Sequence, residues 1–260
     1  MKNIYDDEAF FKEYAKMERS QGLNKAGEWY QLKEIFPDVK DKNVLDLGCG
    51  YGWHCKEAVR RGAKSVLGID MSMKMIQEAE SRNADEKITY RNCGIEEYEY
   101  PMNTYDLVIS NLALHYIEDL KSVYKNVYKT LKESGIFLFN IEHPSFTSGV
   151  YEEWIRDDQG KALYWPIDHY FYPGKRETVF LGKKVMKYHH TLTQILNGLL
   201  ECGFEIEHVE EALPSEEARS LLWMQDEMRR PMMLMVKAKK RETVLTLREN
   251  VTYCEKIHKS

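Results

Sequence analysis

The sequence lacks the features typical of membrane, disulfide-stabilised and zinc-binding proteins. Its 260 residues contain no apolar run near the ~20 residues that a membrane-spanning helix needs. The five cysteines are scattered, odd in number and without a C-x-x-C pair, which argues against disulfides and a metal site and is typical of a reducing cytosol. Residues 1–7 are polar and acidic, unlike a secretory signal. These absences predict a cytoplasmic protein without membrane contact or bound metal.

The chain also lacks a concentration of positive charge. Its formal net charge is −5, with acids and bases interspersed. Nucleic-acid binders usually present a basic face, because neutralisation of phosphates dominates their affinity. The one compact basic run, at residues 237–241, follows an apolar stretch and is interpreted as a solvated strand exit. The composition therefore favours a small-molecule partner over nucleic acid, and it leaves both a monomer and a homodimer open.

Apolar segments alternate with helical patterns through the chain. Strands are predicted at 43–47, 65–70, 88–91, 105–110, 135–141, 204–209 and 232–236. Helices are predicted after the first strand to about residue 61, from residue 72, and at 119–131 and 191–202. This pattern predicts an α/β fold, a Rossmann-like doubly wound seven-stranded sheet that is mostly parallel with an antiparallel last strand. In such sheets ligands bind at the carboxyl ends of the strands.

The flanking segments predict a division of the chain around this core. Two helical patterns, at 6–19 and 24–35, open the sequence, and an aromatic-rich stretch follows the fifth strand. The predicted parts are a helical cap at 1–40, a cofactor-binding core at 41–141, a substrate-covering insertion at 142–190, the rest of the core at 191–240 and a charged tail at 241–260.

The most informative segment is the glycine-rich turn after the first strand, the run LDLGCGYG at residues 45–52. Glycines let a ligand touch the backbone, and the free N–H groups of the turn can bind its polar atoms. Asp70 ends the second strand, twenty-two residues after Gly48. Its carboxylate can accept hydrogen bonds from both hydroxyls of a ribose, each contributing about 1.5–3 kcal/mol. The pair predicts a nucleoside site.

The spacing of the glycines separates two possible cofactors. Dinucleotide sites use G-x-G-x-x-G/A, in which the third small residue allows close helix–strand packing. Here the sixth position is Trp53, which is too bulky for that contact. The pattern therefore favours a nucleoside without phosphates. An NAD-dependent oxidoreductase, which also lacks a visible hydride-transfer pair here, and a purely structural turn are the alternatives.

Residues 44–52 resemble the first motif of class I S-adenosylmethionine (SAM)-dependent methyltransferases, and residues 68–72 resemble the second. The nearest group is the methyltransferase type 11 family, and the similarity runs from about residue 5 to 140. The resemblance implies a SAM-dependent methyltransferase with S-adenosylhomocysteine (SAH) as product. The implied cofactor-binding residues are Tyr14, Arg19, Asp46, Gly48, Cys49, Gly50, Asp70, Met71, Cys93, Gly94, Ile95, Asn111 and Leu112.

Two of these implied contacts have alternatives. Many relatives carry an acidic residue near Cys93, so the adenine contact could instead fall to the Ile95 backbone or the Glu96 side chain, with Cys93 a small buried hydrophobe. Arg19 suits the methionine carboxylate, because a guanidinium binds a carboxylate with two parallel hydrogen bonds. The alternative for Arg19 is a surface ion pair with Glu13 or Glu18.

The acceptor side of the site is less defined. His115, after the fourth strand, and His143, after the fifth, are candidate general bases, because histidine titrates near neutral pH. Tyr116, Trp165 and Tyr170 are candidate substrate contacts. The alternatives are packing roles for the histidines and a small satellite core for the aromatics. DNA amino-methyltransferases carry Asn or Asp followed by Pro-Pro-Tyr or Phe here, and residues 111–114 differ. A SAM-binding module without catalysis also stays open.

Overall fold

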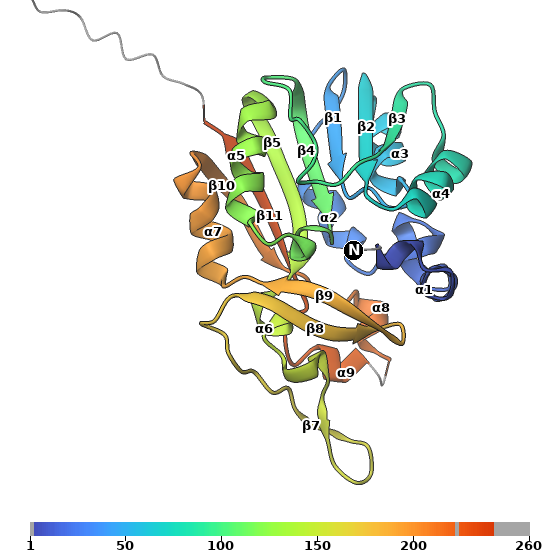
Figure 1. Cartoon of the computed structure of the whole chain (residues 1–260), viewed down its shortest axis with the longest axis vertical. Helices are drawn as coiled ribbons and strands as arrows, with labels where there is room; N and C mark the ends of the chain where they lie inside the picture. The colour runs from blue at the N-terminus through green and yellow to red at the C-terminus, as the bar shows by residue number, and fades with distance from the viewer. Residues whose placement is uncertain (1–2, 222–223, 242–260) are drawn as a thin grey trace, which may run out of the picture.

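The computed structural model describes residues 3–221 and 224–241, so most of the predicted charged tail lies outside the described residues. The core is a seven-stranded sheet with the order β10-β11-β5-β4-β1-β2-β3 (Figure 1). Its strands are β1 (Asn43–Leu47), β2 (Ser65–Asp70), β3 (Ile88–Asn92), β4 (Tyr105–Asn111), β5 (Leu131–Glu142), β10 (Phe204–Glu211) and β11 (Met233–Lys240). Neighbouring strands are parallel except β11, which is antiparallel to both β5 and β10. The predicted Rossmann-like fold is confirmed.

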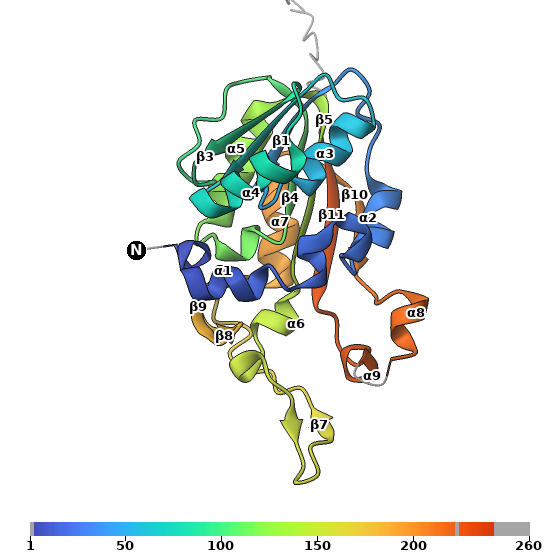
Figure 2. The ribbon, with the colours of Figure 1, turned by 90° about the vertical axis from the view of Figure 1, so that its right-hand side faces the viewer.

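Helices cover both faces of this sheet (Figure 2). One face is covered by α2 (Trp29–Ile35), α3 (Trp53–Arg60) and α4 (Met73–Asn83), and the other by α5 (Leu120–Thr130) and α7 (Leu192–Glu201). Alternate residues of β1 supply the two cores, because successive strand side chains point to opposite faces. Val44 packs in the cluster that holds Ala58, and Leu45 in the cluster that holds Tyr124 and Leu199.

The N-terminal segment forms a cap rather than the predicted long first helix. It contains η1 (Ile4–Asp6), α1 (Glu8–Tyr14), η2 (Glu18–Gln21) and η3 (Leu23–Lys25), followed by α2. The prediction of one helix over 6–19 is wrong beyond Tyr14, because the Tyr14 carbonyl accepts a hydrogen bond from the Ser20 hydroxyl at 2.7 Å and the chain turns there. Asp6 fastens the cap to the start of α4 by accepting from the Ser72 hydroxyl at 2.7 Å and the Lys74 N–H at 3.2 Å.

The insertion after β5 contains two hairpins that the sequence analysis did not predict. Its elements are α6 (Pro144–Thr147), η5 (Val150–Glu152), β6 (Ile155–Arg156), β7 (Ala162–Tyr164), β8 (Gly174–Phe180) and β9 (Lys183–His189). The β8–β9 hairpin lies across the carboxyl edge of the sheet (Figure 1). Its turn reaches the cap, where the rings of Phe180 and Phe10 are 5.8 Å apart and Lys183 lies 3.7 Å from Asp7. The insertion and the cap therefore meet over the strand ends.

The remaining elements complete the described chain. They are η4 (Leu114–Tyr116), α8 (Glu216–Arg219) and α9 (Met224–Glu227). Within residues 3–221 and 224–241, no helix is long and apolar enough to cross a membrane. The same residues hold no group of three or more His, Cys, Asp and Glu side chains arranged to bind a metal ion.

Two buried tyrosines allow a test of the packing around α5. The Tyr124 hydroxyl has no hydrogen-bond partner among the described residues, whereas the Tyr100 hydroxyl donates to the Ile95 carbonyl at 2.8 Å. An unpaired buried polar group costs about 1–3 kcal/mol, so Tyr124→Phe is expected to leave the free energy of unfolding unchanged or raise it by about 1 kcal/mol. Tyr100→Phe is expected to lower it by about 1 kcal/mol. Urea denaturation measures both, and a larger loss for Tyr124→Phe would contradict the assignment.

Candidate functional site

The glycine turn is packed on one side and open on the other. The N–H groups of Gly48 and Cys49 both donate to the Ile69 carbonyl at 2.9 Å, which fixes the turn against β2. Gly48 has a φ of +75°, and a Cβ there would lie 2.4 Å from the Ala113 Cβ, so no other residue fits. At Gly50, with a φ of +53°, a Cβ would meet no atom within 4 Å. The turn therefore has room for a ligand at Gly50. The expectation of free N–H groups is wrong for Gly48, Cys49 and Gly50, because these groups donate to Ile69 and Asp70.

Asp70, at the tip of β2, faces this turn. One carboxylate oxygen accepts the Gly50 N–H at 2.9 Å, and the other accepts the Ser72 N–H at 2.8 Å. Each oxygen keeps a further lone pair for a ligand donor. Burial raises the pKa of Asp70 to about 6, although the two N–H donors oppose that rise. The carboxylate is thus fixed beside the open side of the turn.

The side chains of Asp46 and Cys49 point away from this open side. Asp46 is 1% exposed and accepts a hydrogen bond from the Cys55 thiol at 3.3 Å. Burial raises the pKa of Asp46 to about 7. The Cys49 sulfur packs toward Gly68 of β2. Both side chains belong to the layer between the sheet and α3, so only their main chains border the turn.

The predicted adenine contacts surround Asp70. The Cys93 N–H donates to the Asp70 carbonyl at 2.9 Å, which places the segment after β3 beside the tip of β2. Cys93 is half-buried against the core, and the Ile95 side chain is buried beside Gly48. Met71 is 59% exposed. The structure therefore brings Gly94 and its neighbours together with Met71 around one rim of the turn.

The end of β4 forms the opposite rim. The Asn111 amide donates to Glu28 at 3.1 Å, and its oxygen accepts from Asn140 at 3.0 Å. Leu112 follows with a φ of +54°, and its N–H donates to the Asn140 carbonyl at 2.8 Å. A leucine in the left-handed region is strained, and such strain clusters at functional sites.

Arg19 pairs with neither Glu13 nor Glu18, the partners considered from the sequence. Its guanidinium lies 3.2 Å from Glu28, whose side chain is 1% exposed. The sequence analysis did not select Glu28, because only the folded cap brings it beside Arg19 and Asn111. Tyr14 is half-buried nearby, with its ring 5.4 Å from Tyr5.

His115 and Tyr116 lie in η4, directly beyond Leu112. The His115 Nε2 atom is 3.7 Å from a Glu142 oxygen, and Nδ1 has no partner among the described residues. Burial holds the pKa of His115 well below 6.5, so the ring is neutral at pH 7. The Tyr116 hydroxyl is 2.9 Å from that of Tyr5 in the cap. These two residues therefore connect η4 to β5 and to the cap.

The other three acceptor-side candidates have local partners. His143 caps α6 by accepting the Ser145 N–H at 3.0 Å, and its Nε2 lies 3.0 Å from Glu211. The Trp165 ring stacks on Phe146 at 5.4 Å, and its N–H donates to the Ser145 carbonyl at 3.0 Å. The Tyr170 hydroxyl accepts the N–H of residue 192 at 3.2 Å. This geometry favours the satellite-core alternative for these side chains.

A group of buried charges beside His115 was not selected from the sequence. We call Glu142, Glu152 and Lys187 the buried charge cluster. The Lys187 ammonium lies 2.7 Å from Glu142 and 3.0 Å from Glu152, and its side chain is only 4% exposed. Burial raises the pKa of both glutamates, and the two glutamates raise that of Lys187 although burial alone would lower it. The cluster joins the end of β5 to η5 and β9.

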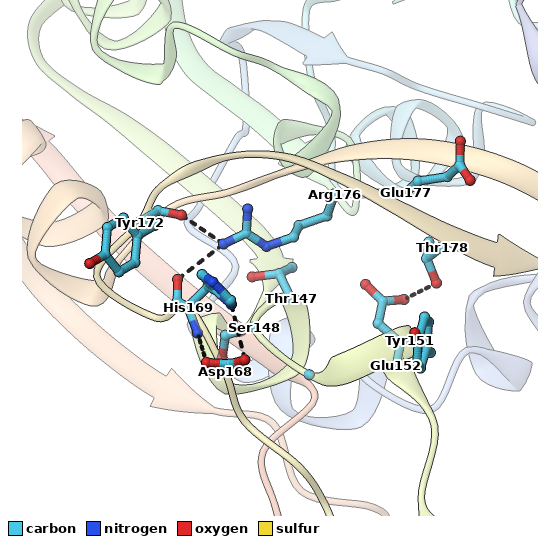
Figure 3. Close-up of a pocket in the computed structure, with 11 residues that line it drawn as sticks. Thr147, Ser148, Tyr151, Glu152, Asp168, His169, Tyr172, Arg176, Glu177 and Thr178 are labelled. Carbon is cyan, nitrogen blue, oxygen red and sulfur yellow. Dashed lines mark hydrogen bonds and ion pairs between the residues drawn. The ribbon is translucent and has the colours of Figure 1, made fainter.

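A cleft of about 410 Å³ opens beside this cluster within the insertion (Figure 3). Glu152 and Thr178 line it, joined by a 3.0 Å hydrogen bond from the Thr178 hydroxyl. Arg176 lines another side, and its guanidinium donates to the carbonyls of His169 at 3.1 Å and Tyr172 at 2.7 Å. We call this cleft the outer cleft. Glu152 lines it and is also a member of the buried charge cluster.

Comparison with known proteins defines the class to which this fold and site belong. A family model described as a methyltransferase domain matches residues 45–139. A solved SAM-dependent methyltransferase from Mesorhizobium loti is 39% identical, covers 84% of this chain over 100% of its own length, and superposes with a TM-score of 0.77. A proposed SAM-dependent methyltransferase from Listeria monocytogenes is 46% identical, with 85% and 99% coverage and a TM-score of 0.81.

A Haemophilus influenzae protein of uncharacterized function is similar as well, with 31% identity over 92% of this chain and 98% of its own length. The chain belongs to the SAM-dependent methyltransferases. It is therefore an enzyme whose methyl donor is SAM, which confirms the cofactor expected from the glycine turn and decides against NAD.

The Arg19–Glu28 pair predicts a pH-dependent contribution to stability. Glu28→Gln leaves Arg19 without its partner and is expected to lower the free energy of unfolding at pH 7 by about 3 kcal/mol. Arg19 and Asn111 hold the pKa of Glu28 below its usual value despite burial. The stabilisation by the Arg19–Glu28 pair is therefore present in full above the pKa of a glutamate in the unfolded chain, about 4.3. It is lost as the pH falls through the lower pKa of Glu28 in the folded protein.

Urea denaturation at pH 7 and below pH 4 measures how much Glu28→Gln lowers the free energy of unfolding at each pH. Glu34→Gln, within α2 and with a side chain 75% exposed beside Lys33, serves as the control and is expected to change little. Equal effects of the two substitutions at pH 7 would contradict a stabilising role for the buried pair.

Proposed function

We propose that this enzyme binds SAM across the turn at residues 48–50 and methylates a small-molecule acceptor. The acceptor lies between the carboxyl ends of β4 and β5 and the insertion at 142–190. The observation that carries this proposal is the fixed carboxylate of Asp70 beside the open backbone of Gly50. A ribose that donates both hydroxyls to Asp70 has space beside Gly50 for the rest of the cofactor.

The residues present fit SAM in each part of this site. Asp70 holds the ribose, and the backbone around Gly48, Cys49 and Gly50 lines the methionine part. Met71, with the segment of Cys93, Gly94 and Ile95, borders the adenine. Arg19 and Tyr14 of the cap face the amino-acid end, and the backbone of Asn111 and Leu112 lies near the sulfonium.

Glu28 acts as a positioning residue in this arrangement. One oxygen binds Arg19 and the other accepts the Asn111 amide. The same carboxylate therefore fixes a side chain of the cap and a side chain at the end of β4. This coupling ties the cap to the end of β4.

SAM supplies an activated methyl group, so the enzyme mainly has to orient the acceptor and exclude water. Alignment of this kind supplies about 7–11 kcal/mol of a barrier. The cap and the β8–β9 hairpin provide the enclosure, because Phe10 meets Phe180 and Tyr5 meets Tyr116 over the strand ends. Water exclusion then strengthens electrostatic contacts inside the site.

His115 is the candidate base for an acceptor that must lose a proton. Its Nε2 atom lies 3.7 Å from Glu142 and its Nδ1 atom has no partner among the described residues, so a neutral ring protonated at Nε2 carries its lone pair on Nδ1. His143 is the weaker candidate, because the Ser145 N–H and Glu211 occupy its two ring nitrogens.

A small-molecule acceptor agrees better with the charge of the chain than RNA does. The net charge of −5 disfavours the binding of a phosphate backbone. An RNA acceptor would require binding that weakens steeply with salt, which a filter-binding titration measures.

The Asp70 assignment predicts a loss of cofactor affinity. Asp70→Asn is expected to lower SAH affinity at least about tenfold, because charge-assisted hydrogen bonds contribute about 1.5–3 kcal/mol each. In the unsubstituted enzyme the affinity is expected to fall as the pH drops below about 6, where Asp70 takes up a proton and accepts hydrogen bonds less well. Asp70→Asn is expected to lack this dependence.

Isothermal titration with SAH between pH 5 and 8 provides the measurement. Asp85→Asn is the control, since Asp85 pairs with Lys56 at 3.1 Å outside the proposed site. Unchanged SAH affinity in Asp70→Asn would defeat the ribose assignment.

The proposed role of His115 predicts a separation of binding from turnover. His115→Ala is expected to keep SAH affinity within about twofold, less than 0.5 kcal/mol. Turnover of an acceptor that loses a proton is expected to fall about 10²-fold or more. Calorimetry and a coupled assay of SAH release measure the two quantities, and unchanged turnover would make His115 a structural residue.

A further inference from the structure

A second cleft, with a volume of about 470 Å³, lies on the face of the sheet that α2 and α3 cover (Figure 2). Residues of η2, η3, α2, α3 and α4 line it. None of the residues proposed to bind SAM is among them, and the outer cleft is separate because residues of the insertion line that one. The volume is within the roughly 300–1,000 Å³ of small-molecule sites.

Five cations line this cleft against one carboxylate, and we call it the basic cleft. The cations are Lys25, Lys33, Lys56, Arg60 and Arg61. The carboxylate is that of Glu57, which lies 2.6 Å from Arg60 and 2.7 Å from Arg61 and so serves two guanidinium groups. The sequence alone does not reveal this concentration of positive charge, because only folding brings residues 25–33 beside residues 56–61.

Carboxylates outside the lining do not remove the excess of positive charge. Glu34 lies 3.9 Å from Lys33, and Asp85 lies 3.1 Å from Lys56. With both of them included, five positive charges meet three negative charges, so two positive charges remain. Lys25 is exposed and has no ion-pair partner among the described residues. The basic cleft therefore favours an anion that carries two charges.

Arg61 is held in place within this lining. Its guanidinium carbon lies 4.6 Å from the centre of the Phe36 ring and 5.8 Å from that of Trp29, and aromatic faces within ~6 Å attract cations. Its Nε–H donates to Glu57 at 2.7 Å. The Nη1 atom has no partner among the described residues, so the fixed guanidinium keeps donors for a ligand oxygen.

We propose that the basic cleft binds the phosphate group of a small phosphate monoester. This inference goes beyond the proposed function, because it assigns a site outside those of SAM and the acceptor. A phosphate monoester carries close to two negative charges at neutral pH and offers three acceptor oxygens. Guanidinium groups match such oxygens with parallel hydrogen bonds.

Other anions match the cleft less well. A carboxylate or a sulfate ester brings a single charge and leaves half of the excess unbalanced. A nucleic-acid backbone also brings one charge per phosphate, and the net charge of −5 on the whole chain disfavours a long polyanion. A small dianion therefore agrees best with both the charge and the volume.

The experiment measures the affinity of the full chain for phenyl phosphate, phenyl sulfate and phenol, by calorimetry at about pH 7.5 with and without SAH. Phenyl phosphate is expected to bind about fivefold or more tightly than phenyl sulfate, which has a similar shape and one charge fewer, and phenol is expected to bind most weakly. At about pH 5 the phosphate takes up a proton, and its preference over the sulfate is expected to disappear.

Two matched variants locate the binding. Lys25→Glu reverses an exposed charge of the basic cleft and is expected to weaken the binding of phenyl phosphate about fivefold or more. Lys64→Glu is the control, because Lys64 is also exposed but lies before β2 and outside the lining. It changes the net charge of the chain by the same amount and is expected to keep the affinity within about twofold.

Three results would overturn the inference. The first is equal affinity for phenyl phosphate and phenyl sulfate, or an equal loss in the two variants. The second is displacement of phenyl phosphate by SAH, because the probe would then occupy the proposed cofactor site. The third is a short single-stranded RNA that displaces the probe at lower concentration and with a steep dependence on salt, which assigns the cleft to a nucleic-acid backbone. SAH binding to the unsubstituted enzyme and to Asp70→Asn tests the proposed function separately.

Discussion

The carboxylate of Asp70 is the constraint on which the rest of the site depends. Its two hydrogen bonds tie the glycine turn after β1 to the beginning of α4, so two neighbouring strand ends share one anchor. Ser72, which donates its N–H to Asp70, is the N-cap residue of α4, and its hydroxyl also donates to Asp6 in the N-terminal cap. The turn, the strand tip, the helix start and the cap are therefore joined through a few short bonds at the carboxyl edge of the sheet.

A second set of contacts gives this edge its enclosure. The sheet alone would leave the strand ends open to water, but the cap and the β8–β9 hairpin approach from opposite sides and meet at Phe10 and Phe180. Beneath them, Lys187 holds Glu142 of the core against Glu152 of the insertion. The glycine turn and Asp70 thus belong to the core of the sheet, whereas the buried charge cluster joins that core to the inserted segment.

The sheet and the glycine turn could be predicted from the sequence because their signals are local. Val44, Leu45 and Leu47 form an apolar strand directly before the turn, and Asp70 ends the next strand at a characteristic spacing. The charged contacts of the site could not be predicted in the same way. Glu28 and Lys187 acquire their partners only when distant segments fold together. The strand β9 was hidden from the sequence because its buried face consists of Val185, Lys187 and His189, two of which are polar.

The position of the cap has a consequence for how the enzyme can be handled. Tyr5, Asp6 and Asp7 form a wall of the site, but none of them belongs to either hydrophobic cluster of the core. A chain that lacks residues 1–7 keeps every strand and the residues of both clusters. It loses the contacts with Ser72, Tyr116 and Lys183. The first residues of the chain thus contribute to the closure of the strand ends rather than to the two hydrophobic clusters.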